Sequence, residues 1–126
     1  EVLITADTVV CIHDRILGKP ADRKEAISML RELSGNRHLV VTGVSVTTRT
    51  EQLSFSSRTD VFFKHLSNEE IIFYVDTYKP FDKAGAYGIQ EWIGYIGIER
   101  IEGSFYNVMG LPIQKLYETL RKLQFQ

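Results

Sequence analysis

The amino-acid sequence predicts one α/β domain over residues 1–126, with a mixed sheet that contains a long hairpin. The length of 126 residues, with 44% hydrophobic and 25% charged residues, is typical of a single globular domain. Helix-like and strand-like segments are interleaved without a regular βαβ rhythm, which favours a mixed sheet. Two strand-like runs, 38–47 and 52–66, are joined by only four residues and predict the hairpin.

The first part of the chain predicts a strand, a turn and a loop. Residues 2–12 are β-branched and apolar apart from Asp7, which indicates a largely buried strand. Residues 13–14 predict the turn that ends this strand. Residues 15–20 predict a loop rather than a second strand, because their proline cannot donate to a sheet ladder and their glycine permits unusual backbone angles.

Two helices carry capping signals at their N-termini. Asp22, with Glu25 three residues later, predicts the start of a helix that runs to Ser34, and the apolar residues that follow recur at helical spacing. Ser67 and Glu70 form the same pattern at the start of a second helix, which ends at the following Lys-Pro pair. These signals place one helix on each side of the hairpin in sequence.

The last part of the chain is rich in glycine before it becomes helical again. Residues 81–103 hold several glycines among aromatic residues and isoleucines, which predicts short strands and tight turns. Trp92 and Tyr95 in this segment suit core packing, base stacking or a dimer interface. Pro112 suits the first turn of a final helix. Functional residues are expected to gather in the glycine-rich segment.

Composition excludes several classes of function. The formal net charge of −1 provides no overall positive field for nucleic acid or an anionic membrane. Cys11 is the single cysteine, so an internal disulfide is impossible, and this usage fits the cytoplasm. No apolar run approaches the roughly 20 residues that a membrane span requires. The chain starts at Glu1 rather than Met and enters a strand at once, so we expect an N-terminal part to be missing.

Asp7 is the first candidate for chemistry. A carboxylate inside an apolar strand is costly unless it is paired, hydrogen-bonded or bound to a metal ion. The alternative is a structural aspartate that caps a turn or meets an arginine. Lys19, between Gly18 and Pro20, lies on a loop of defined shape and suits a phosphate contact, although most lysines are simply solvated.

The run Asp82-Lys83-Ala84-Gly85-Ala86-Tyr87-Gly88-Ile89-Gln90 is the most informative segment. It combines a carboxylate, a cation, small residues, an aromatic ring and an amide that reads a base edge, which are the parts of a nucleotide site. The alternative is a tight turn in which Asp82 and Lys83 are surface ions and Tyr87 packs in the core. Polar residues before the final helix, Ser104 and Asn107, suit either an anion contact or helix capping.

Two other kinds of centre are not indicated. The histidines show no metal-ligand spacing with one another or with Cys11, so zinc is not expected. A Gly-x-Ser-x-Gly nucleophile elbow is absent from the sequence.

The order of these segments closely resembles the Maf family of nucleoside triphosphate pyrophosphatases, over essentially all 126 residues. The resemblance rests on segments in the following order: Ala-Asp-Thr-Val-Val at 6–10, Gly-Lys-Pro at 18–20, Leu-Ser-Gly at 33–35 with Val-Thr-Gly-Val at 41–44, the run 82–90, Ile-Glu-Gly-Ser at 101–104 and Asn-Val-Met-Gly-Leu-Pro at 107–112. It points to the branch that acts on dTTP and UTP rather than on 7-methyl-GTP.

The resemblance implies a role for each matching residue. Asp7 matches the catalytic carboxylate, a proton acceptor that also suits metal binding. Thr8 and Gln90 match positions tied to substrate choice, and Lys19 and Lys83 match basic residues of the triphosphate site. The family also implies a fold like that of the inosine triphosphate pyrophosphatases, with a cleft between two lobes, a homodimer, and a divalent cofactor such as Mg²⁺ or Mn²⁺.

The chain departs from the family pattern in two places. The family begins with a Ser-x-Ser-Pro-Arg-Arg segment, a glutamate and a lysine, and this chain starts after them, so we expect an incomplete active site. Glu91 stands where the family often has glycine. Two alternatives to the enzyme remain: a nucleotide-binding regulator without catalysis, linked to septum formation, and a structural fragment that associates through exposed apolar surface.

Overall fold

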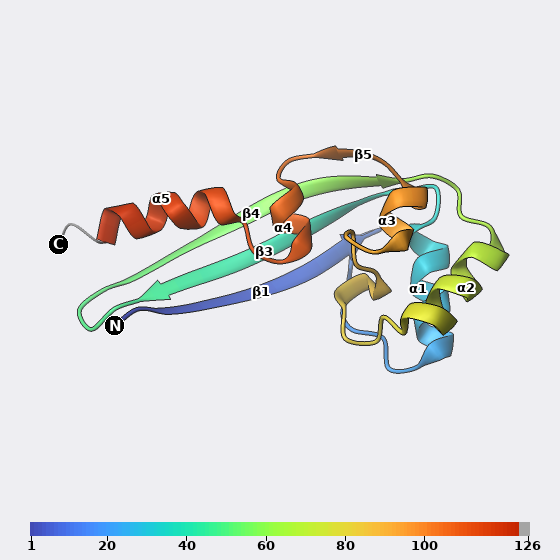
Figure 1. Cartoon of the computed structure of the whole chain (residues 1–126), viewed down its shortest axis with the longest axis horizontal. Helices are drawn as coiled ribbons and strands as arrows, with labels where there is room; N and C mark the ends of the chain where they lie inside the picture. Colours follow the sequence, from blue (N-terminus) through green and yellow to red (C-terminus); the bar gives the residue numbers. More distant parts are fainter. Residues whose placement is uncertain (124–126) are drawn as a thin grey trace.

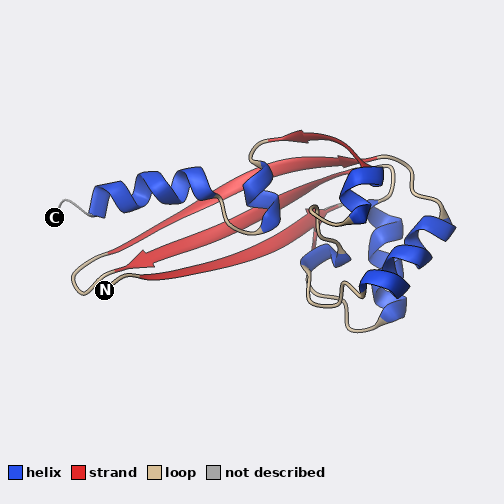
Figure 2. Cartoon of the chain, in the orientation of Figure 1, coloured by secondary structure: helices blue, strands red, loops and turns tan. Residues whose placement is uncertain are grey.

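The computed structural model describes residues 1–123, which form one sheet with helices at both of its ends (Figure 1). Figure 2 shows the long strands of the sheet as a twisted ribbon, with most helices gathered at one end. The elements in chain order are β1 Leu3–Ile12, β2 Arg15–Leu17, α1 Arg23–Leu33, β3 Arg37–Thr47, β4 Gln52–Phe63, α2 Asn68–Tyr78, the short 3₁₀ helix η1 Ala84–Ala86, α3 Trp92–Gly97, β5 Ile98–Glu102, α4 Phe105–Met109 and α5 Ile113–Leu123.

The sheet has the strand order β2-β1-β3-β4-β5. The predicted α/β class and the long β3–β4 hairpin are confirmed, and the connection 48–51 is as expected. Every strand pairing among residues 1–123 is antiparallel, so the parallel pairing that a mixed sheet implies is not found there. Each strand reaches its neighbour through a hairpin or through a connection that returns in the opposite direction, which makes antiparallel pairing the direct outcome.

Three elements differ from the sequence prediction. Residues 15–17 form β2 rather than a loop, because His13 and Asp14 adopt φ of 51° and 60° and make a tight hairpin turn. The proline and glycine that argued against a strand lie beyond its end. Two short helices, α3 and α4, occupy segments that were expected to hold only strands, turns and polar residues.

The main core lies at the helical end of the sheet. Helices α1, α2 and α3 pack there against β1, β3 and β4 through fully buried side chains such as Leu30, Tyr74 and Ile93. A smaller cluster lies at the other end, where Leu116 and Leu123 of α5 cover β3 and β4. The first half of β1 is exposed rather than buried as predicted: Leu3 is 62% exposed, because no described element covers this stretch.

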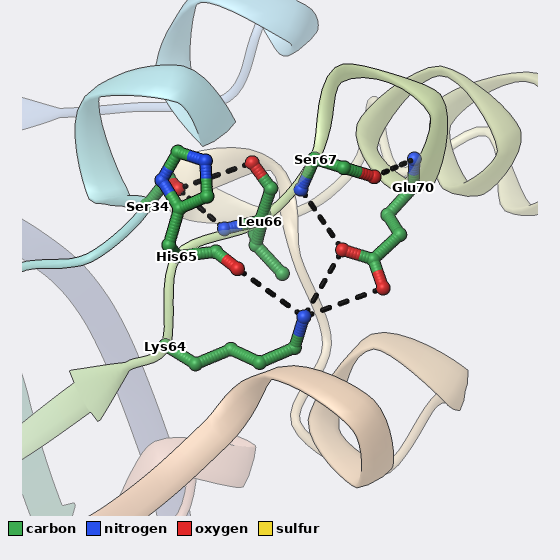
Figure 3. A network of polar contacts seen from close by, with 6 residues as sticks. All are labelled: Ser34, Lys64, His65, Leu66, Ser67 and Glu70. Carbon is green, nitrogen blue, oxygen red and sulfur yellow. Dashed lines mark hydrogen bonds and ion pairs between the residues drawn. The ribbon is translucent and has the colours of Figure 1, made fainter.

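The predicted helix caps are confirmed, and one of them organises the corner between α1, β4 and α2. Ser67 accepts a hydrogen bond from the Glu70 backbone at 3.0 Å, while the Glu70 carboxylate accepts from the Ser67 backbone at 2.9 Å. Figure 3 shows that Lys64 also donates to Glu70 and that Ser34, at the end of α1, bonds the backbone of Leu66. The Ser67 backbone N–H, followed by Lys64, holds the pKa of Glu70 below its usual range.

Candidate functional site

A cavity of about 430 Å³ opens beside β1 and collects segments from most of the chain. One wall is β1 itself, from Ala6 to Val10. The loop after β2 supplies Gly18 and Lys19, the segment between α2 and α3 supplies residues 82–84, 87, 88 and 90, and α4 with the residue after it supplies 108–110. The cavity therefore lies between the helical end of the molecule and the short helix that crosses the middle of the ribbon (Figure 1).

The cavity exists because β1 has an open edge. Strand β2 pairs with β1 only from Val10 to Ile12, whereas β3 pairs with β1 from Leu3 to Cys11. Within residues 1–123, the stretch before Val10 thus has a partner strand on one side only. Alternate residues of such a stretch direct their backbone N–H and C=O groups away from the sheet, toward the cavity side.

The structure brings together all five residues that the sequence analysis selected. Asp7 and Thr8 from β1, Lys19 from the loop after β2, and Lys83 and Gln90 from the segment before α3 all line this cavity. The Gly85 backbone N–H donates to the Gly18 carbonyl at 3.1 Å and so joins the two loops that carry the lysines. The catalytic and substrate-binding roles of these five residues stay predictions.

Lys83 is held among carboxylates at the cavity. Its ammonium lies 3.1 Å from Asp82 Oδ1 and 3.9 Å from Glu91 Oε2, and its side chain is 26% exposed. The hydrogen bond from Lys83 lowers the pKa of Asp82, and the charge of Lys19 adds a smaller effect in the same direction. Lys19 and Lys83 therefore both act on the Asp82 carboxylate, while Glu91 also lies close to Lys83.

The segment that carries Lys83 and Gln90 is anchored to α2 by a buried tyrosine. The Tyr74 hydroxyl donates to Glu91 Oε1 and accepts from the Gly88 backbone N–H at 3.1 Å. Burial, reinforced by Glu91, raises the pKa of Tyr74 above its usual range, so the phenol keeps its proton. Glu91 thus links Tyr74 to Lys83.

Tyr87 is buried in the core, and it also forms part of the cavity lining. Its hydroxyl lies 2.6 Å from Nε2 of the buried His38, and its ring packs edge-on against His38 and Phe63. The structural alternative for Tyr87 is therefore correct. Trp92 packs against Phe73, whereas Tyr95 is 86% exposed. Burial lowers the pKa of His38 to about 4, so this imidazole is neutral near pH 7.

Asn107 positions the α4 wall of the cavity, a role that sequence reasoning missed. Its side chain is fully buried, and Nδ2 donates to Val40 O at 3.2 Å, Ser57 O at 3.1 Å and Thr59 Oγ1 at 2.8 Å. These contacts fasten α4 to both β3 and β4. Ser104 only caps α4, because its hydroxyl accepts from the Asn107 backbone N–H at 3.2 Å.

The sequence signal for Asn107 was present but ambiguous. An asparagine between aromatic and apolar residues fits a surface cap as well as a buried clamp, and only the packing of α4 on the sheet distinguishes the two. Thr42 occurs in the run 41–44 that contributes to the family resemblance, but its contact with Thr8 was missed for a similar reason. It lies opposite Thr8 in the β1–β3 register, and that register follows from the pairing of strands far apart in sequence.

Two negative findings apply to the described part of the chain. No cluster of three or more His, Cys, Asp or Glu side chains suited to a metal ion occurs in residues 1–123. No helix within that range has the length and apolar character that crossing a membrane requires.

Comparison with known proteins identifies a family and several named relatives. The family model described as Maf-like protein matches residues 1–123. A dTTP/UTP pyrophosphatase of Bacteroides thetaiotaomicron is 62% identical over 123 residues, which cover 98% of this chain and 64% of that protein. Proteins of the same name from Porphyromonas gingivalis and Cytophaga hutchinsonii are 62% and 51% identical, over 95% and 98% of this chain and 60% and 56% of their own lengths.

The chain thus spans less than two thirds of the length of these curated relatives, from 56% to 64%. The family match, in contrast, extends over almost every residue and includes each segment that lines the cavity. The chain belongs to the Maf family.

Proposed function

We propose that the protein hydrolyses dTTP and UTP to the nucleoside monophosphate and pyrophosphate, with the cavity beside β1 as part of its active site. The observation that carries this proposal is the convergence of Asp7, Thr8, Lys19, Lys83 and Gln90 from three separate segments onto one cavity. The names of the most similar relatives support the same substrates.

The lysines give the cavity its affinity for the triphosphate. Lys19 and Lys83 approach from different loops and balance charge as it builds on the leaving pyrophosphate. In the free protein the Lys83 ammonium is neutralised by Asp82 at 3.1 Å. A phosphate oxygen replaces that contact, and the remaining carboxylate, Glu91, keeps the ammonium oriented.

Asp7 supplies the proton acceptor. It lies on the open edge of β1, is exposed to solvent, and is reached from the same cavity that holds the lysines. In this position it accepts the proton of the water that attacks the bond between the α and β phosphates. Thr8 and Gln90 contact the pyrimidine, and the amide of Gln90 offers a donor and an acceptor together.

The residues present fit a divalent cation as cofactor. Mg²⁺ is bound through one or two carboxylates together with substrate phosphates, and Asp7 and Asp82 are two carboxylates at the cavity. Asp7 would hold the ion, which when bound makes a coordinated water more acidic and offsets phosphate charge. A homodimer and a cytoplasmic location are further proposals, and both rest on the family resemblance.

The test is pyrophosphate release from dTTP, UTP, CTP, GTP, ATP and 7-methyl-GTP, with Mg²⁺ or Mn²⁺. It is made with this chain and with any longer gene product that contains it. Asp7→Asn is expected to reduce turnover of dTTP and UTP by about 10²-fold or more. Asp14→Asn, in the exposed β1–β2 turn, is the matched control and is expected to leave turnover unchanged.

Two results would contradict the proposal. Full turnover by Asp7→Asn would remove Asp7 from the mechanism. Tight binding of dTTP or UTP without pyrophosphate release from any form of the protein would favour the regulator over the enzyme.

A further inference from the structure

The hydroxyl of Thr8 is hydrogen-bonded to that of a second threonine, Thr42, which does not line the cavity. Thr8 and Thr42 lie directly opposite each other in the antiparallel β1–β3 pair, and their Oγ1 atoms are 2.9 Å apart. Thr8 lines the cavity and is partly exposed, whereas Thr42 is fully buried. The hydroxyl of Thr42 therefore acts on a ligand only through Thr8.

The neighbours of Thr42 decide which threonine donates. Thr42 Oγ1 also lies 3.3 Å from the backbone carbonyl oxygen of Asn107, and a carbonyl oxygen can only accept. Each hydroxyl carries a single proton. Only one assignment forms both hydrogen bonds: Thr42 donates to the Asn107 carbonyl, and Thr8 donates to Thr42.

The carbonyl at the end of this chain is firmly placed. It also accepts from the Gly110 backbone N–H at 3.0 Å, and the Asn107 side chain is hydrogen-bonded to β3 and β4. A backbone group held in this way does not reorient when a ligand enters. The direction of the hydrogen bonds from Thr8 through Thr42 to Asn107 is therefore built into the fold.

With its proton directed into the sheet, Thr8 offers only lone pairs to the cavity. A ligand atom opposite Thr8 must then be a hydrogen-bond donor, since two acceptors facing each other are unfavourable. Thymine and uracil share an imide N–H at ring position 3. Cytosine has an unprotonated nitrogen at that position, which is an acceptor.

We infer that Thr42 is a positioning residue that makes Thr8 a hydrogen-bond acceptor for the imide N–H of thymine or uracil, and so selects against cytosine. This inference rests on the proposed function and deepens it. It assigns a role in base selection to a side chain that touches neither substrate nor cavity.

The experiment compares kcat/KM for UTP with that for CTP in the wild type and two variants of Thr42. Thr42→Val keeps the shape of the side chain but cannot accept from Thr8, so the Thr8 hydroxyl is free to turn and donate to cytosine. The UTP-to-CTP ratio is expected to fall by roughly tenfold, as one hydrogen bond of about 1.4 kcal/mol predicts. Thr42→Ser keeps the hydroxyl and is expected to retain the wild-type ratio.

Two measurements separate selection from a general loss of structure. The ratio is measured within one protein sample, so a lower folded fraction changes both substrates equally. Thr8→Val is expected to lower the ratio as well, and the Thr8→Val, Thr42→Val double variant should lower it no further than Thr8→Val alone. The triphosphate of 3-methyluridine lacks the imide N–H, so its kcat/KM with the wild type should not exceed that of CTP.

An unchanged ratio in Thr42→Val, or an equal fall in Thr42→Ser, would overturn the inference. Equal losses for UTP and CTP would place a sugar hydroxyl rather than the base opposite Thr8, and would also overturn it. If the wild-type protein hydrolyses no nucleotide, the proposed function is wrong, and the inference about Thr42 is tested by binding instead. The same ratio is then measured as Kd for UMP against CMP by titration calorimetry, with the same outcomes decisive.

Discussion

Replacing Asn107 by alanine tests whether one buried amide holds the α4 wall against the sheet. The two protons of Nδ2 serve three acceptors, Val40 O, Ser57 O and Thr59 Oγ1, at 2.8–3.2 Å. Removing them takes a donor from each of these buried acceptors, at about 1–3 kcal/mol for each bond that no other group replaces. Because two protons are lost, Asn107→Ala is expected to lower the free energy of unfolding by about 2–4 kcal/mol.

The assay is urea denaturation followed by circular dichroism. For an m-value of about 2 kcal/mol per molar urea, the expected loss lowers the midpoint by roughly 1–2 M. Asn107→Asp sharpens the test, because a carboxylate would place an acceptor against the same three acceptors and should destabilise more than alanine. Asn36→Ala removes an exposed amide with one side-chain hydrogen bond and should cost less than about 1 kcal/mol.

Two results would refute the role of Asn107. One is a midpoint shift in Asn107→Ala no larger than that in Asn36→Ala. The other is an Asn107→Asp variant more stable than Asn107→Ala, which would mean that Nδ2 is not the group that holds α4.

Three further predictions concern the helical end. The pKa of His38 is about 4 in the folded protein, so between pH 6.5 and 4 this histidine gains a proton mainly in the unfolded chain. The free energy of unfolding should therefore fall by about 3 kcal/mol over this range relative to His38→Gln, as measured by urea titrations at each pH. Gly94→Ala would place a Cβ atom 1.8 Å from the Ile89 carbonyl oxygen and should cost about 3 kcal/mol or more, measured as a lower melting temperature. Tyr74→Phe leaves the buried Gly88 N–H without its acceptor and should lower the free energy of unfolding in urea by about 1–3 kcal/mol.

Each of these predictions has a control elsewhere in the chain. His13→Gln changes an exposed histidine and should alter the free energy of unfolding at pH 7 by less than about 1 kcal/mol. Gly43→Ala meets no atom within 4 Å and should be tolerated to within about 1 kcal/mol. Tyr95→Phe removes a hydroxyl from a side chain that is 86% exposed and should have no measurable effect. A control as severe as its matched variant would contradict the packing described.

Secondary-structure elements were predicted correctly where the evidence came from residues close together in sequence. The caps at Asp22 and Ser67 and the four-residue connection of the hairpin were predicted correctly, because each depends on side chains within one turn of the chain. The strand at 15–17 was missed because its formation depends on the conformation of the preceding turn rather than on its own composition.

The candidate site was predictable as a set of residues but not as a geometry. Asp7, Lys19 and the run 82–90 stood out because charged and small residues occur among apolar ones, and Asp7, Lys19 and most of that run line the cavity. Short-range sequence patterns did not indicate that Thr42 is hydrogen-bonded to Thr8 or that Tyr74 is hydrogen-bonded to Glu91. These contacts join segments 17 or more residues apart.

The sequence by itself therefore determined the family, the helix starts and the chemical inventory of the site, since these depend on residue types and short spacings. The tertiary structure alone decided which edge of β1 is open, which hydroxyl donates to which, and which buried amide holds the wall. The physical reason is that hydrogen-bond direction and strand register are properties of groups brought together across the fold. Both are established only when the chain folds.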